Sequence, residues 1–225
     1  MVSFRKLFGL KKPKPPAPAM PDIAELCRAH GVAVTGVVHV GANRGDEIAA
    51  YDSLGATRVL FVEANPDLAA GLRARFVDRP EVVVGAFAAS DRAGSVAFHL
   101  TSFDQSSSLL KLKRHAEIYP EIVPTRTIDV PAKRLDDALV ELGLAEAPFD
   151  FLALDIQGAE LMALRGCPDL LGRVRAVNCE LAFEELYEGC ALAPAIDAHL
   201  AMFGFRRVAT ATPFHPSWGD GFYTR

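Results

Sequence analysis

The sequence lacks any uncharged apolar run of the ~18 residues that a membrane-spanning helix needs, although 50% of its 225 residues are hydrophobic. It has only four cysteines, and their positions form neither a C-x-x-C pair nor a metal-finger spacing. No apolar stretch of about 7 to 15 residues precedes the first prolines, so a secretory signal is not expected. These absences argue against membrane-spanning and disulfide-stapled proteins, and they predict a cytoplasmic protein with reduced thiols.

Negative charge is scarce only at the start of the chain. Residues 1–20 carry five Lys or Arg and no acid, so the remainder holds a net charge of −9 within a total of −4. We expect 1–20 to be a basic, Pro-rich flexible tail and 21–225 to be one catalytic domain. The tail is either a solubilising segment or a weak contact with an anionic membrane surface at the inner membrane face. The acidic body disfavours a nucleic-acid partner.

The most informative segment is an apolar run, residues 37–40, that breaks into the turn Gly41-Ala42-Asn43-Arg44-Gly45 and returns one helix later as a run ending in Glu63. This order describes the first half of a nucleotide-binding α/β domain. A carboxylate at the end of the second strand can accept hydrogen bonds from both ribose hydroxyls. The pair of features predicts a ligand that contains adenosine.

The sequence also lacks the third glycine of the G-x-G-x-x-G dinucleotide fingerprint. Asn43 takes the middle glycine position of the G-x-G-x-G loop found in many S-adenosylmethionine (SAM) enzymes, and Asn tolerates a positive φ. Asp46 and Glu47 are expected to open the following helix, where they would repel a pyrophosphate. A phosphate-free ligand such as SAM fits better than a dinucleotide.

Strand and helix patterns alternate from residue 21 onward, which predicts a mostly parallel sheet with helices on both faces. We expect helices over 22–30, 46–54, 66–76, 159–165 and 195–203. We expect strands over 37–40, 59–63, 82–84, 95–100, 151–155, 174–180, 206–209 and 221–224. Binding sites of such sheets lie at the carboxyl ends of the strands. The residues that would lie there include His39, residues 86–88, Asp155 with Gln157 and Glu160, and Glu180.

The chain resembles the FkbM-type SAM-dependent methyltransferases in the order of several motifs. These are residues 40–45, 61–66, 88–94, 106–109, 135–136 and 154–160, followed by Glu180 and residues 186–189, 203–205 and 218–220. The resemblance covers roughly residues 36 to 225. It implies a Rossmann-like methyltransferase fold, a seven-stranded sheet with one antiparallel strand near the C-terminus, and O-methylation of hydroxyls on sugars, polyketides or similar molecules. The chain departs from the family at His39, where an Asp is usual, and this weakens the carboxylate contact expected near the SAM amino group.

The resemblance also assigns roles to residues. Gly41, Asn43 and Gly45 would wrap the methionine part of SAM, Glu63 would hold the ribose, and Asp155 would border the methyl-transfer space. The predicted cofactor-binding set is His39, Gly41, Asn43, Gly45, Glu63, Ala64, Ala86, Phe87, Ala88 and Asp155.

An alcohol is a poor nucleophile, so a general base is needed, and the candidates are Asp155, Glu160, Glu180, His39 and His215, with Asp155 first by position. A metal site is not expected, although the first three acids could gather Mg²⁺. The acceptor is expected to be a small molecule or a glycan, which Tyr119, Trp218 or His215 could stack against. The alternatives are a nicotinamide-dependent oxidoreductase and a SAM-binding module without catalysis.

Overall fold

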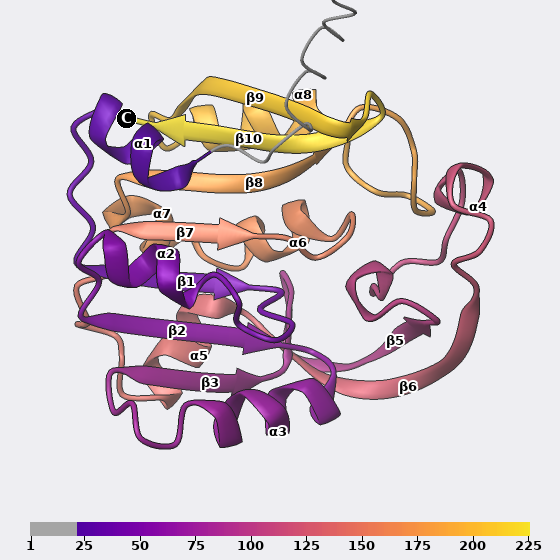
Figure 1. Cartoon of the computed structure of the whole chain (residues 1–225), viewed down its shortest axis with the longest axis horizontal. Helices are drawn as coiled ribbons and strands as arrows, with labels where there is room; N and C mark the ends of the chain where they lie inside the picture. Colours follow the sequence, from indigo (N-terminus) through magenta and orange to yellow (C-terminus); the bar gives the residue numbers. More distant parts are fainter. Residues whose placement is uncertain (1–21) are drawn as a thin grey trace, which may run out of the picture.

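The computed structural model describes residues 22–225, so the expected basic tail lies outside the described residues. A large sheet, a small sheet and flanking helices make up this part of the chain (Figure 1). The strands of the large sheet are β1 (Gly36–Val40), β2 (Arg58–Glu63), β3 (Val82–Ala86), β7 (Phe151–Leu154), β8 (Ala176–Ala182), β9 (Arg206–His215) and β10 (Trp218–Thr224).

The large sheet has the strand order β3-β2-β1-β7-β8-β10-β9. The ladders joining β3, β2, β1, β7 and β8 are parallel, whereas β10 runs antiparallel to both of its neighbours. The expected fold class, a mostly parallel seven-stranded sheet with an antiparallel strand near the C-terminus, is confirmed. The chain reverses its direction of winding between β1 and β7, which is where open α/β sheets place their sites.

Side chains of the central strands alternate between two hydrophobic cores. In β2, Val59 and Phe61 pack in one core while Leu60 and Val62 pack in the other, as the period of two of a strand requires. The first core is covered by α1 (Ile23–Ala29), α2 (Ile48–Ser53) and α3 (Pro66–Arg75). The second is covered by α5 (Leu135–Glu141), α6 (Glu160–Arg165), α7 (Pro168–Arg173) and α8 (Ala193–Ala201). Within residues 22–225, none of the helices is both long and apolar enough to cross a bilayer.

A second sheet, with the order β4-β6-β5, lies beyond the carboxyl ends of the parallel strands (Figure 1, right). It consists of β4 (Ala88–Ala89), β5 (Gly94–Thr101) and β6 (Pro124–Lys133), and the 3-10 helix η1 (Asp104–Ser106) and α4 (His115–Ile118) connect β5 to β6. The sequence predicted β5 but missed β6. Pro124 and Pro131 argue against a strand, and most of β6 is exposed, so it shows no apolar pattern.

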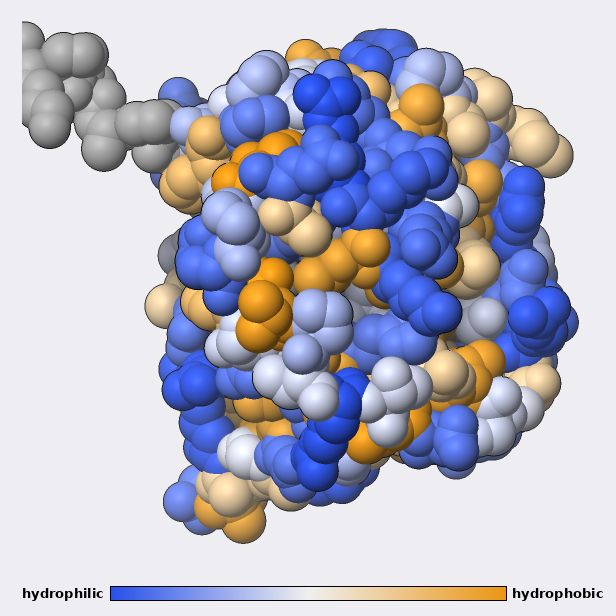
Figure 2. All heavy atoms as spheres, turned by 90° about the vertical axis from the view of Figure 1, so that its right-hand side faces the viewer, coloured by the Kyte–Doolittle hydropathy of each residue, from blue (hydrophilic) through white to orange (hydrophobic). Residues whose placement is uncertain are grey.

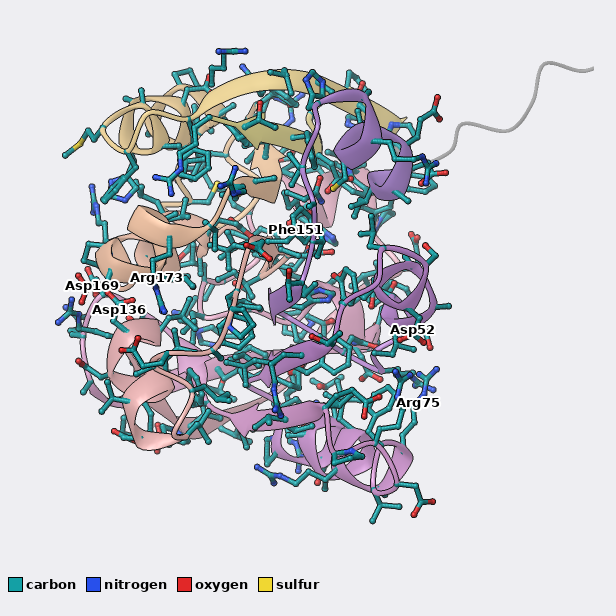
Figure 3. All side chains as sticks on the ribbon, turned by 90° about the vertical axis from the view of Figure 1, so that its left-hand side faces the viewer. Asp52, Arg75, Asp136, Phe151, Asp169 and Arg173 are labelled. Carbon is teal, nitrogen blue, oxygen red and sulfur yellow. The ribbon has the colours of Figure 1, made fainter. Side chains whose placement is uncertain are left out.

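Asp136 holds the start of α7 from a distant point in the sequence. Its two carboxylate oxygens accept hydrogen bonds from the backbone N–H groups of Asp169 (2.9 Å) and Leu170 (3.0 Å). Cys167, the residue before α7, provides no side-chain cap, so Asp136 takes over that role. Asp136 and Asp169 lie side by side where α5 meets α7 (Figure 3). The Leu135-Asp136 motif is therefore structural.

Candidate active site

A cavity of about 700 Å³ opens at the carboxyl ends of the parallel strands. Figure 2 views this face, where hydrophobic residues gather around hollows in a mostly hydrophilic surface. The cavity wall begins at residues that follow β2 and β3 and continues past β1 and β7 to β8 and β10. Its acids are Glu47, Glu63, Asp104, Asp155 and Glu180, and the described lining residues include neither Lys nor Arg. The cavity therefore favours ligands with positive charge, such as the ammonium and sulfonium groups of SAM.

The glycine loop, residues 41–45, connects β1 to α2 at one side of the cavity. Gly41 has a φ of +87°, and a Cβ there would lie 1.8 Å from the backbone oxygen of Asp155, so only glycine lets the loop pass the end of β7. Asn43 has a positive φ of 45°, as its turn position predicts. Gly41 and Asn43 line the cavity, whereas Gly45 packs against α3 near Leu72 and does not.

Glu63 lies buried at the end of β2, and its carboxylate organises two segments of the cavity wall. Oε2 accepts a hydrogen bond from the backbone N–H of Asn43 (2.8 Å), and Oε1 accepts one from that of Asn65 (2.7 Å). Burial raises the pKa of Glu63 despite these donors. An ionised carboxylate offers about four acceptor positions, so each oxygen retains capacity for a ribose hydroxyl.

The wall beside Glu63 is small and apolar. Ala64, Leu68, Phe87 and Ala88 line it, which suits the flat faces of an adenine ring. Ala86, which the sequence placed with Phe87 and Ala88, ends β3 outside the lining.

His39 lies behind the glycine loop on the face of the sheet that α2 covers. It is 5% exposed, and its Nδ1 shares a hydrogen bond with the Tyr51 hydroxyl (3.0 Å). Burial lowers the pKa of His39 to about 4, so the ring is neutral at pH 7. His39 does not line the cavity, because side chains of a strand alternate between faces and this one points into the core with Phe61.

Asp155 directly follows β7 and faces the cavity, where its side chain is exposed. Gln157, in a left-handed conformation (φ 57°), joins it to a second acid. The Gln157 Nε2 donates to Asp155 Oδ1 (2.7 Å) and to both carboxylate oxygens of Glu180 (3.0 and 3.1 Å). Its Oε1 accepts from the Tyr187 hydroxyl (2.7 Å), a partner that the sequence did not predict as a site residue. Surrounding protein raises the pKa of Asp155 and raises that of Glu180 well above its usual value, the latter also through repulsion by Asp155.

Glu160, a predicted catalytic residue, is buried behind this pair and does not line the cavity. Its Oε1 accepts from the backbone N–H groups of Ile156 (2.9 Å) and Gly158 (3.1 Å). Burial raises the pKa of Glu160 to about 7. The geometry gives Glu160 the task of holding the loop that carries Gln157.

Asp220 on β10 is a further buried acid, one that the sequence did not predict as a site residue. It is paired in register with Glu180, and its Oδ1 accepts a long hydrogen bond from Asn178 Nδ2 (3.4 Å). Its Oδ2 has no partner among the described residues. Burial, and secondarily the charge of Asp155, raises the pKa of Asp220 to about 7.

Asp220 should make stability depend on pH. Its pKa in the fold lies above the ordinary value of 3.8, so its stabilising contribution is complete below about pH 4 and is lost as the pH rises through about 7. We expect Asp220→Asn, which cannot ionise, to unfold at a higher temperature than wild type at pH 8, and this advantage to be much smaller at pH 5. Thermal unfolding at the two pH values measures this, and an equal difference at both would contradict it.

No three His, Cys, Asp or Glu side chains of residues 22–225 lie close enough together to hold a metal ion. Asp155 and Glu180 share the Gln157 amide as their common partner.

The far end of the cavity is aromatic. Tyr119, Phe214 and Trp218 line it, and the last two stack with ring centroids 5.6 Å apart. Trp218 Nε1 donates to the Tyr119 hydroxyl (3.1 Å), which fixes the indole plane. His115 lines this end too and was not predicted, whereas His215 accepts from the backbone of Ser217 (3.2 Å) outside the lining. Such a wall offers a ligand a large apolar contact area with polar groups at its edges.

The comparisons with known proteins agree with this geometry. Among solved structures, magnesium protoporphyrin IX methyltransferase from Synechocystis PCC 6803 with bound SAM has a TM-score of 0.51 at 11% identity, over 90% of this chain and 76% of that one. Fibrillarin from Aeropyrum pernix, also with SAM, has a TM-score of 0.50 at 12% identity, over 84% of this chain and 66% of that one. These likenesses define the class of fold as that of the SAM-dependent methyltransferases.

The model of the FkbM methyltransferase domain matches residues 39–207. A curated relative, the 2-O-methyltransferase NoeI of Sinorhizobium fredii (strain NBRC 101917 / NGR234), is 30% identical over 161 residues, which are 68% of this chain. The aligned region spans 65% of the length of NoeI. The chain belongs to the FkbM methyltransferase family, and the resemblance seen in the sequence is confirmed. The FkbM family is SAM-dependent, which agrees with the cofactor expected from the glycine loop and Glu63.

Proposed function

We propose that this methyltransferase transfers a methyl group to a hydroxyl of a neutral sugar, within a glycan or a similar small polyhydroxylated acceptor. The observation that carries the proposal is that aromatic side chains, which can stack on sugar rings, line the same cavity as Asp155, in a wall whose described residues include neither Lys nor Arg. Without a cation in the described wall, an acceptor that carries a phosphate would lose its hydration there and gain no ionic partner. NoeI, named as a 2-O-methyltransferase, supports transfer to oxygen.

When bound, SAM supplies a methyl group on a positively charged sulfur. Glu63 accepts hydrogen bonds from the ribose, while Ala64, Phe87 and Ala88 flank the adenine. Gly41 and Asn43 leave room for the methionine part. We assign Gly45, Ala86, His39 and Glu160 to the support of this wall from behind, since they do not line the cavity.

Asp155 is the proposed general base. Gln157 holds its Oδ1, which leaves Oδ2 free to take the proton from the acceptor hydroxyl. Glu180, on the other side of the Gln157 amide, keeps that amide oriented toward Asp155. Positioning the acceptor oxygen against the aromatic wall provides the other part of the acceleration. We further propose that residues 21–225 act as one methyltransferase domain.

Comparison of cells with and without the gene tests the acceptor class. We expect mass spectrometry of their polysaccharides and small-molecule extracts to show the loss of an O-methyl group from a sugar. A methyl group lost instead from protein, nucleic acid or a phosphate-bearing nucleotide would contradict the proposal. Unchanged methylation would point to a SAM-binding module without catalysis.

Trp218 gives a direct reading of acceptor binding, because it is the sole tryptophan in the sequence and lies in the aromatic wall. In the presence of S-adenosylhomocysteine (SAH), we expect the identified sugar to change tryptophan fluorescence in a saturable manner. Phe214→Ala should weaken this response, and Met202→Ala, another exposed apolar side chain away from the lining, should leave it unchanged. A response that is unaffected by Phe214→Ala would place the acceptor elsewhere.

A further inference from the structure

The glycine-loop end of the cavity contains an acid that the sequence placed in the first turn of a helix. α2 starts at Ile48, two residues later than expected, because the turn through Gly45 (φ +72°) continues past the glycine loop. Asp46 and Glu47 therefore precede the helical turns. Asp46 points outward and pairs with Arg75 (2.7 Å), whereas Glu47 lines the cavity beside Gly41 and Asn43.

Glu47 has no strong partner of its own. The nearest basic atom to its carboxylate is Nδ1 of His39, at 3.9 Å, and that ring is neutral at pH 7 and already shares its Nδ1 with Tyr51. No described side chain donates a hydrogen bond to the Glu47 carboxylate. Its side chain is 47% exposed to the cavity and solvent, and the protein around the rest of it raises its pKa. A carboxylate in this position gains from a cation brought by a ligand.

SAM brings such a cation to this end. With Glu63 at the ribose, the amino-acid part of the cofactor reaches the glycine loop, and its α-ammonium group needs a negative partner. The strand that leads into the loop ends in His39 and Val40, and neither carries a negative charge. Asp155 also faces this region, but its Oδ1 is held by Gln157 and we assign its other oxygen to the acceptor.

We propose that Glu47 receives the α-ammonium group of SAM and so positions the methionine part of the cofactor. It is a positioning residue for the cofactor and takes no proton from the acceptor. The proposal uses the cofactor that the family defines and does not depend on which acceptor the enzyme methylates.

The test uses two ligands that differ only at the amino group, SAH and its deamino analogue, in which hydrogen replaces that group. SAH carries no sulfonium charge, so the comparison isolates the ammonium. By calorimetric titration we expect wild type to bind SAH on the order of 10-fold to 100-fold more tightly than the deamino analogue. Glu47→Gln should reduce this preference to less than about 3-fold by weakening SAH alone.

Asp46→Asn is the matched control, because it removes the same charge from the neighbouring residue, whose side chain is 75% exposed and outside the lining. We expect it to keep the wild-type preference. An unchanged preference in Glu47→Gln would overturn the proposal. An equal loss of affinity for both ligands in Glu47→Gln would also overturn it, as would a loss of the preference for SAH in Asp46→Asn. Glu47→Ala, measured in the same way, guards against an effect specific to glutamine, and it should reproduce the lost preference.

Discussion

Asp155→Asn is expected to reduce the rate of methyl transfer by about 10²- to 10⁴-fold, the usual contribution of a general base, while SAH affinity changes by less than about 3-fold. The amide cannot take a proton from the acceptor, yet it preserves the shape of Asp155 and can still meet the Gln157 side chain. Single-turnover rates with labelled SAM and calorimetric SAH titration separate the two effects.

The pH profile of activity provides a second test of Asp155 as the general base. Asp155 must be ionised to act, and the protein around its carboxylate, together with the charge of Glu47, raises its pKa. We therefore expect activity to rise with pH over a range above the ordinary Asp value of 3.8 and to remain at its plateau above that range.

Asp104→Asn serves as the matched control for Asp155. It removes another cavity-lining carboxylate, one that pairs with Arg44 (3.4 Å) at the surface and has no contact with Gln157. We expect it to retain most of the wild-type rate. Full activity of Asp155→Asn, or an equal loss in Asp104→Asn, would show that Asp155 is not the base.

Glu63→Gln should weaken SAH binding by on the order of 10-fold to 100-fold, which corresponds to about 1.5 to 3 kcal/mol for hydrogen bonds to a charged group. Each Glu63 oxygen accepts from a backbone N–H, and the amide nitrogen of Gln cannot accept at all. The variant loses one backbone contact and one ribose acceptor together.

The ligands that test Glu47 also distinguish the role of Glu63 at the ribose from that of Glu47 at the amino group. Because Glu63 is assigned to the ribose, Glu63→Gln should weaken SAH and deamino-SAH equally, and binding of free adenosine should fall as well. If Glu63→Gln weakened the binding of SAH but not that of deamino-SAH or adenosine, the two carboxylates would have been assigned to the wrong ends of the cavity.

The sequence predicted the parts of the fold that one segment encodes locally. β1 and β2 are buried on both faces, so their apolar runs stand out, and the glycine loop and Glu63 follow directly from the ends of these runs. The sequence did not predict β6, because most of its residues are exposed and give no apolar pattern, and its prolines argue against strand pairing. Nothing in the segment 124–133 alone shows that β5 will pair with it.

The sequence could predict which strand ends carry the site residues, but not in which direction each side chain points. His39 and Glu160 occupy the expected positions, yet both point away from the cavity, the first into the core beneath α2 and the second into a loop of backbone N–H groups. Glu47 was predicted to lie in the helix because the sequence does not mark a helix start to within two residues. The stack of Phe214 on Trp218 depends on a hairpin between β9 and β10 whose register no single segment specifies.

Parallel calorimetric titration of the wild-type protein with SAH and with NAD⁺ tests the central claim most directly. The cavity is acidic, has one carboxylate assigned to a ribose, Glu63, and has neither Lys nor Arg among its described lining residues. We therefore expect one SAH to bind per chain and no heat with NAD⁺, whose pyrophosphate the cavity would repel. Saturable binding of NAD⁺ with no response to SAH would contradict the account.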